Sequence, residues 1–164
     1  MIAEGEWSVR GSRIRQQFDF VLTDSLGHSV LVVEVKATPR TRELDLPRWA
    51  SSLRRNLAAH GALPASTYFL MLVIPEVGYL WSNPEAPLDA LPDYYVDLNE
   101  LNTPGDSIPI GGGQEAEKWA SRSLAALLES RLSPTGLWWT ESGLERALQN
   151  KPVEIIQHRP AKAS

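Results

Sequence analysis

Two apolar runs on either side of a short polar turn constrain the fold of this chain more than any other feature. They lie in residues 16 to 37, QQFDFVLTDSLGHSVLVVEVKA, where residues 24 to 27 have the composition of a reversing turn. The second run, Val30 to Val35, is rich in β-branched residues and is apolar on both faces. Such a strand is typical of the centre of a sheet with layers above and below it. We therefore predict a β-hairpin whose second strand is central and whose sheet is covered by helices.

The segments around the hairpin predict an α/β protein with a mixed central sheet flanked by helices. A helix is expected to begin near Asp45 and end at Gly61, because apolar side chains recur at helical spacing between them. The run at 67–74, TYFLMLVI, predicts a second buried strand, and a shorter strand is expected at 79–81. An irregular strand is predicted upstream, at residues 7–15.

The C-terminal half is predicted to be a proline-rich wrap followed by helices. Residues 82–113 are expected to run over the surface, and residues 114–132 are expected to form a helix with one apolar stripe. A further helix is predicted to begin near Ser142, where the sequence matches a capping box. Trp138 and Trp139 precede it, and core packing is favoured for this pair over base stacking.

The length of 164 residues predicts one domain with its own core. We assign residues 1–151 to that domain, with a core at 14–81 and a C-terminal helical part at 114–151. Residues 152–164 are expected to be a frayed tail.

Composition excludes several function classes. Cysteine is absent, which rules out disulfides, thiolate metal sites and cysteine nucleophiles. No leader-like segment and no run of 18 or more apolar residues is present, so a cytoplasmic location without membrane insertion is expected. The three histidines fall in a turn, at a helix end and in the tail, and each is interpreted as a surface residue.

The hairpin contains three charged residues that are expected to meet. If the turn centres between Leu26 and Gly27, paired residues have numbers that sum to 53, so Asp19 lies opposite Glu34. Lys36, two residues beyond Glu34, points to the same face. Two carboxylates alone would repel, so a cation is expected between them: the lysine, a divalent metal, or both. A bulge in the turn that changed the register by one residue would move Asp19 to the other face.

Basic residues concentrate after the second strand of the hairpin. Residues 36 to 55 contain six basic and two acidic side chains, although the whole chain has a net charge of −4. We predict that Arg40, Arg42, Arg54 and Arg55 contact the phosphate backbone of DNA without reading its sequence. The alternative interpretation is a solvated helix face with ordinary surface arginines.

Asp19, the sequence Glu34-Val35-Lys36 on the next strand, a helix and another buried strand together resemble the PD-(D/E)XK nuclease superfamily. The resemblance covers about residues 14–81 and implies a restriction endonuclease-like fold. It implies that Asp19, Glu34 and the carbonyl oxygen of Val35 are ligands of Mg²⁺ or Mn²⁺. It also implies that Lys36 orients or deprotonates the attacking water, so that Asp19, Glu34 and Lys36 are the catalytic residues.

Three features of the family pattern are altered in this chain. The residue before Asp19 is Phe18 and not proline, a change that the family tolerates widely. The acidic residue that the family usually carries on an N-terminal helix has only Glu4 and Glu6 as counterparts, which leaves room for a homodimer or a partner protein to complete the site. The helix after Lys36 lacks the glutamine and tyrosine that often occur there.

The sequence thus predicts a Mg²⁺-dependent endonuclease that cleaves DNA in a defence, repair or mobile-element system. A hard divalent cation prefers oxygen ligands and lowers the pKa of bound water, which suits the residue types independently of the resemblance. The alternative is a catalytically inactive domain of the same fold that binds nucleic acid or assembles with other proteins, in which the three charges form a buried ion-pair cluster.

Overall fold

The structure is a computed structural model that describes residues 18–41, 44–61, 63, 67–149 and 153–157. Its strands are β2 (Phe20–Asp24), β3 (Ser29–Ala37), β4 (Tyr68–Ile74), β5 (Val77–Trp81), β6 (Tyr94–Val96) and β7 (Val153–Gln157). Its helices are α1 (Leu46–Gly61), α2 (Gln114–Leu128), α3 (Leu137–Thr140) and α4 (Leu144–Gln149), with a 3₁₀ turn at Leu98–Leu101. The irregular strand predicted at residues 7–15 lies outside the described residues.

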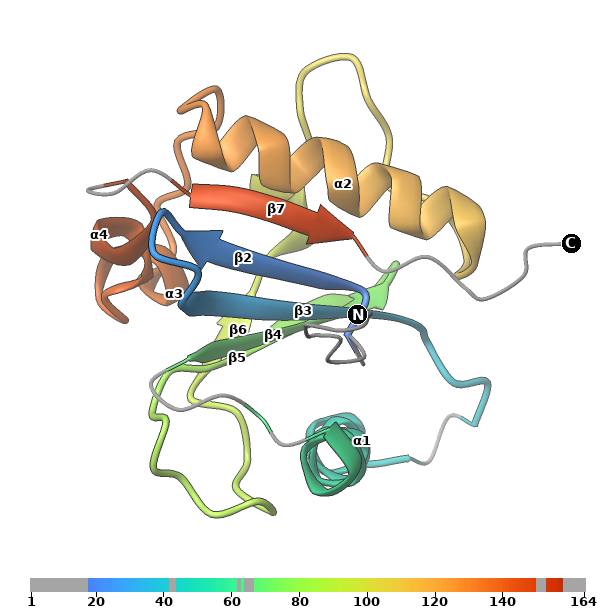
Figure 1. Cartoon of the computed structure of the whole chain (residues 1–164). Helices are drawn as coiled ribbons and strands as arrows, with labels where there is room; N and C mark the ends of the chain where they lie inside the picture. The colour runs from blue at the N-terminus through green and yellow to red at the C-terminus, as the bar shows by residue number, and fades with distance from the viewer. Residues whose placement is uncertain (1–17, 42–43, 62, 64–66, 150–152, 158–164) are drawn as a thin grey trace, which may run out of the picture.

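The six strands form one mixed sheet in the order β6-β5-β4-β3-β2-β7. Strands β3 and β4 are parallel and every other pair is antiparallel. The parallel pair requires a crossover connection, which α1 provides. Helix α1 lies on one side of the sheet and α2 on the other (Figure 1). The predicted α/β class, with a mixed central sheet flanked by helices, is confirmed.

The register of the hairpin also agrees with the prediction. Leu22 pairs with Leu31, Val21 with Val32 and Phe20 with Val33. The ladder shifts only between Leu22 and Thr23, on the turn side. On the turn side, Thr23 pairs with Ser29, so the turn centres at Leu26 and not between Leu26 and Gly27 as predicted. The irregularity between Leu22 and Thr23 shifts the pairing by one residue and gives the predicted register toward Asp19.

Each face of the sheet buries its own apolar cluster. On the α1 side, Val32, Phe69 and Met71 pack with Trp49 and other residues of α1. On the other side, α2 contributes Trp119, Leu124 and Leu127 to a larger cluster that also contains Trp138 and Trp139. The tryptophan pair is almost fully buried, so its predicted role in core packing is confirmed.

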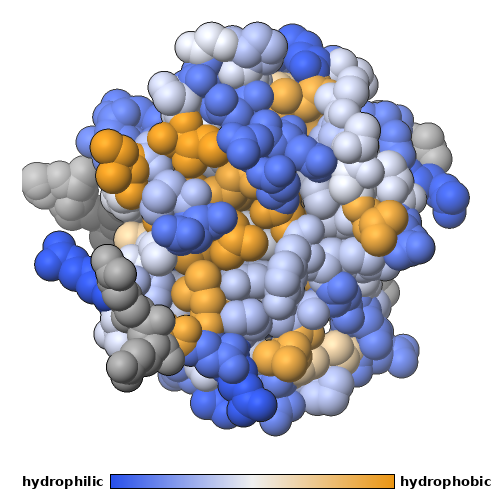
Figure 2. Space-filling model, turned by 180° about the vertical axis from the view of Figure 1, so that it is seen from behind, coloured by the Kyte–Doolittle hydropathy of each residue, from blue (hydrophilic) through white to orange (hydrophobic). Residues whose placement is uncertain are grey.

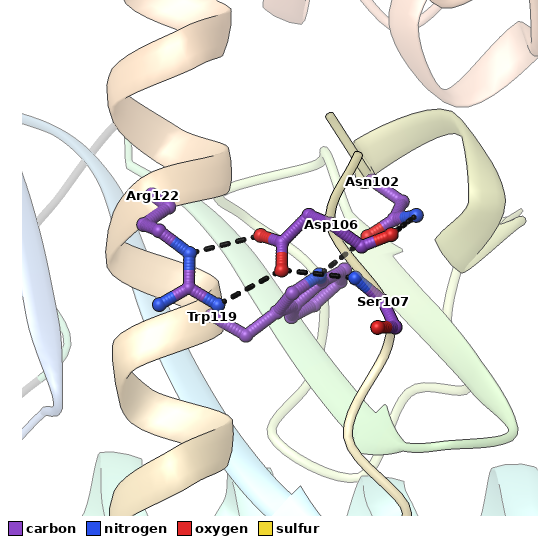
Figure 3. A network of polar contacts seen from close by, with 5 residues as sticks. All are labelled: Asn102, Asp106, Ser107, Trp119 and Arg122. Atoms are coloured by element: carbon purple, nitrogen blue, oxygen red, sulfur yellow. Dashed lines mark hydrogen bonds and ion pairs between the residues drawn. The ribbon is translucent and has the colours of Figure 1, made fainter. Parts of the chain in front are cut away.

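A polar network fixes residues 82–113, which we call the wrap, to α2, as Figure 3 shows. The guanidinium of Arg122 donates to both carboxylate oxygens of Asp106, at 2.8 and 3.1 Å, and this lowers the pKa of Asp106. The indole nitrogen of Trp119 donates to Asn102 at 2.9 Å, and Asn102 donates to the carbonyl of Asp106 at 3.0 Å. The segment before α2 is therefore held along one side of that helix.

Strands β3 and β5 are longer than predicted, and two further differences from the sequence predictions are larger. Helix α2 ends at Leu128 and not at Leu132, because Ser130 adopts a left-handed conformation (φ 59°) that closes the last turn. Residues 153–157, predicted as part of a frayed tail, form β7 and pair with β2. Val153 and Ile155 pack against the α2-side cluster, which explains why this segment is ordered as an edge strand.

Some large apolar side chains remain exposed. On the face opposite to that of Figure 1, they form several groups separated by hydrophilic side chains (Figure 2). Exposed apolar residues of this kind are common on folded proteins. No helix among the described residues has the length and hydropathy needed to cross a bilayer. The exposed large apolar residues are Leu26, Leu44, Leu88, Leu91, Tyr95, Ile110, Leu137 and Ile156.

Candidate metal and nuclease site

The carboxylates of Asp19 and Glu34 meet where the β2–β3 ladder stops. The last backbone pair is Phe20 with Val33. Beyond it, hydrogen bonds from backbone N–H groups to side-chain carboxylates connect the two chain segments. The backbone N–H of Asp19 donates to Oε1 of Glu34 at 2.7 Å. The N–H of Val35 donates to Oδ2 of Asp19 at 2.8 Å. Each carboxylate therefore reaches across to the opposite strand, and the two predicted ligands are neighbours.

Lys36 completes the group from the same strand. Its Nζ lies 3.5 Å from Oε2 of Glu34. Glu34 is almost fully buried, with a side-chain exposure of 5%, whereas the side chain of Lys36 is 36% exposed. Alternation along β3 from Val32 places Glu34 and Lys36 on the α1 side of the sheet. The structure thus brings together Asp19, Glu34 and Lys36, as the register predicts.

Burial dominates the electrostatics of Glu34. Burial and the nearby carboxylate of Asp19 raise the pKa of Glu34 to about 7, against the opposing effects of the Asp19 N–H and of Lys36. The lysine therefore compensates the negative charge only in part. An additional cation that reaches Glu34 would therefore stabilise the ionised form of its carboxylate.

The donor set fits a divalent cation bound through two carboxylates. Oδ1 of Asp19 has no hydrogen bond to any described residue, and the half-exposed Lys36 is the one described residue that forms an ion pair with Oε2 of Glu34. Mg²⁺ commonly uses one or two carboxylates and completes its octahedron with water and substrate oxygens. Within the described ranges, no cluster of three or more acidic or histidine side chains suits a metal ion. Glu4 and Glu6 lie outside those ranges, and the Val35 carbonyl as a ligand stays a prediction.

The predicted phosphate-binding arginines do not form one group. Arg54 is 1% exposed, so the prediction that it contacts DNA is wrong. Its guanidinium lies over the rings of Phe69 and Trp81, at 5.9 and 5.4 Å from their centroids. Arg40 and Arg55 are exposed, and Arg42 lies outside the described residues. Helical spacing explains the error, because adjacent residues 54 and 55 differ by about 100° in direction.

The end of β3 also contacts a glycine that the sequence analysis did not select. A Cβ at Gly112 would lie 2.8 Å from the Cβ of Ala37 and 3.3 Å from its backbone. The loop before α2 therefore approaches the strand end directly after Lys36. Three consecutive glycines at 111–113 were the available sequence signal.

The chain was compared with protein-family models, curated proteins and solved structures, and none of them matches it. What defines the protein is therefore its own geometry. It is an α/β protein with a six-stranded mixed sheet, and two carboxylates and a lysine meet at the end of its central hairpin.

Proposed function

We propose that this protein is a Mg²⁺- or Mn²⁺-dependent nuclease of the PD-(D/E)XK type that cleaves DNA phosphodiester bonds. The observation that carries the proposal is the meeting of Asp19 and Glu34 across β2 and β3, with Lys36 bound to Glu34. The parallel pair β3–β4 with its crossover helix α1 supports the restriction endonuclease-like fold that this function implies.

Each residue of the site has a distinct role in the proposal. Asp19 and Glu34 hold the cation, together with the carbonyl oxygen of Val35. When bound, the cation supplies a lowered pKa for coordinated water and charge neutralisation at the phosphate. The ammonium of Lys36, half exposed beside Glu34, contacts the attacking water or the phosphate oxygens and offsets the negative charge that develops there.

A second function, a non-catalytic binding or assembly module, is favoured by one specific observation. Both carboxylates accept backbone N–H groups from the opposite strand, which closes the end of the hairpin without any metal. In that case Asp19, Glu34 and Lys36 form a structural cluster, and removal of one member of a buried pair costs roughly 3 to 5 kcal/mol.

Melting temperatures and plasmid cleavage, each measured with and without Mg²⁺ or Mn²⁺, separate the two functions. For a nuclease, the metal raises the melting temperature of the wild type and allows cleavage. Glu34→Gln should abolish both effects and leave the metal-free protein at least as stable as the wild type, because it removes the carboxylate repulsion. Glu145→Gln, an exposed change of the same kind on α4, is the matched control.

The opposite pattern would reject the nuclease. In that pattern, neither metal changes the melting temperature of the wild type, and Glu34→Gln causes a large loss of stability. The fold would then remain, and the site would be a structural ion-pair cluster.

A further inference from the structure

The structure has a groove between α1 and the wrap to which the proposed function gives no role. We call it the α1 groove. It has a volume of about 370 Å³ and lies on the α1 side of the sheet, as Asp19, Glu34 and Lys36 do. Its lining residues are Arg48, Ser51, Ser52, Arg55, Asp89 and Leu91.

The wall of the α1 groove that comes from the wrap is fixed by side chains beneath it. The carbonyl oxygens of residues 87 to 90 all accept hydrogen bonds from α1 or β5. Arg54 donates to the first two at 3.3 and 3.2 Å. The hydroxyl of Ser51 lies 3.0 and 2.8 Å from the last two, and the indole of Trp81 donates to the last at 2.8 Å. A groove that is fixed before binding loses little conformational entropy when a ligand enters.

Two guanidinium groups face the solvent along the other wall. Arg48 and Arg55 are separated by seven residues, which is two helical turns or about 10 Å along the axis, so they share one face of α1 with Ser52 between them. Arg55 forms no ion pair within the described part of the chain. Arg48 pairs with Asp45 at 3.3 Å, but both side chains are largely exposed, so the pair is weak and a ligand can replace it.

The buried Arg54 adds positive charge behind this surface. It forms no ion pair with any described residue, and its Nε has no hydrogen-bond partner among them. The carboxylate of Asp93 offsets part of its charge. Because buried charges are screened less than exposed ones, the guanidinium contributes to the potential at the groove.

The chemistry of the lining selects the ligand. Guanidinium forks suit phosphate oxygens, and the Ser52 hydroxyl can donate to the same group. Asp89 repels additional anions but accepts a hydrogen bond from a neutral donor, and Leu91 offers an apolar contact. A nucleotide unit carries phosphate, neutral donors and an apolar ring face, whereas an acidic peptide brings further carboxylates against Asp89.

We propose that the α1 groove binds a nucleotide unit of a nucleic-acid strand, with Arg48 and Arg55 on its phosphates and Asp89 on a donor of the sugar or base. This inference rests on the proposed function, because it places the strand on the same side of the sheet as the candidate site. It adds a binding position that is separate from the group formed by Asp19, Glu34 and Lys36.

Binding of labelled 20-residue DNA, single-stranded and duplex, tests the groove without metal. Measurements in EDTA over a range of salt concentrations use the wild type, Arg48→Glu, Arg55→Glu and the uncharged Arg48→Gln and Arg55→Gln. Each change should weaken binding at least about tenfold and reduce the salt slope by about one unit for a lost phosphate contact. Arg131→Glu, an exposed change of the same charge after α2, should bind as the wild type does. Melting temperatures establish that each variant is folded.

The inference is overturned by a wild type that does not bind DNA, by groove variants that bind as the wild type does, or by binding of poly-glutamate in preference to DNA. A free nucleotide such as dAMP that competes at micromolar concentration also overturns it, because the groove would then serve small ligands. Cleavage with Mg²⁺ is measured separately. Loss of binding in the groove variants without any cleavage by the wild type would support the groove and reject the nuclease, and the reverse result would reject only the groove.

Discussion

At the scale of single residues, Glu34 and Arg54 show how burial changes the role of a charge. Both are almost fully buried, and both lie on the α1 side of the sheet. Glu34 has a partial counter-ion in Lys36 and a neighbouring carboxylate in Asp19, and together with burial this raises its pKa. Arg54 is surrounded by aromatic rings and backbone carbonyls, which makes it a structural anchor for the wrap.

The raised pKa of Glu34 predicts a specific dependence of stability on pH. The pKa is about 7 in the folded state and 4.5 ordinarily. The folded chain therefore keeps a proton that the unfolded chain has released between these values, and the free energy of unfolding falls as the pH rises through this window. The loss approaches about 3 kcal/mol above pH 7.

Urea unfolding at several pH values, in EDTA, measures this effect. Glu34→Gln cannot ionise, so it should match the wild type near pH 4 and exceed its stability by up to about 3 kcal/mol at pH 8. Glu154→Gln, an exposed glutamate on β7, should keep the wild-type slope. Equal slopes for the wild type and Glu34→Gln would show that Glu34 is ionised without penalty in the fold.

At the scale of elements, the end of β3 is determined by what packs on it. Strand β3 pairs with β2 on one side and with β4 on the other. The loop at 110–113 then approaches Ala37 so closely that only glycine fits at position 112. This contact connects the start of α2 with the strand that carries Glu34 and Lys36.

Gly112→Ala should therefore destabilise the protein by about 1 to 3 kcal/mol, because its Cβ would overlap the rigid Cβ of Ala37. The adjacent Gly111→Ala is the matched control, since a Cβ there meets no atom within 4 Å. It should change stability by no more than about 0.5 kcal/mol. Thermal unfolding of the three proteins measures the difference, and equal melting temperatures for both variants would contradict the contact.

At the scale of the whole molecule, the sheet joins the two ends of the described chain. Strand β7 comes last in the sequence but pairs with β2, the first described strand. Figure 1 shows β7 beside β2 and under α2. The last described segment therefore covers one edge of the hairpin that carries the candidate site.

A chain ending at residue 152 should lose about 3 kcal/mol or more of stability. It lacks the contacts of Val153 and Ile155 with the α2-side cluster, and it exposes the edge of β2 to pairing with other chains. Thermal unfolding and size-exclusion chromatography would detect the lower melting temperature and the association. A chain ending at residue 157 keeps β7 and serves as the control. Identical melting temperatures would mean that β7 contributes nothing to the fold.

The sequence by itself determined the local elements and the hairpin register. Apolar runs and helical spacing place β4 and α1 within one residue of their observed bounds and β3 within two. The predicted register agrees with the structure beyond Thr23, where the irregularity between Leu22 and Thr23 offsets a turn centred at Leu26, and the meeting of Asp19 with Glu34 follows from that register. These features depend on neighbours close in sequence, where composition and spacing carry the information.

Only the tertiary structure decided which charged side chains are buried and which distant segments pair. Arg54 could not be distinguished from Arg55 by residue type, because its environment is made by Phe69, Trp81 and the wrap. From the sequence alone, the β7 segment was predicted to be part of a frayed tail. It forms a strand because the edge of β2 is available for pairing. The raised pKa of Glu34 likewise depends on the layers that bury it. In each case, the environment of the residue is made by atoms that are far away in sequence. A local sequence pattern carries no information about those atoms.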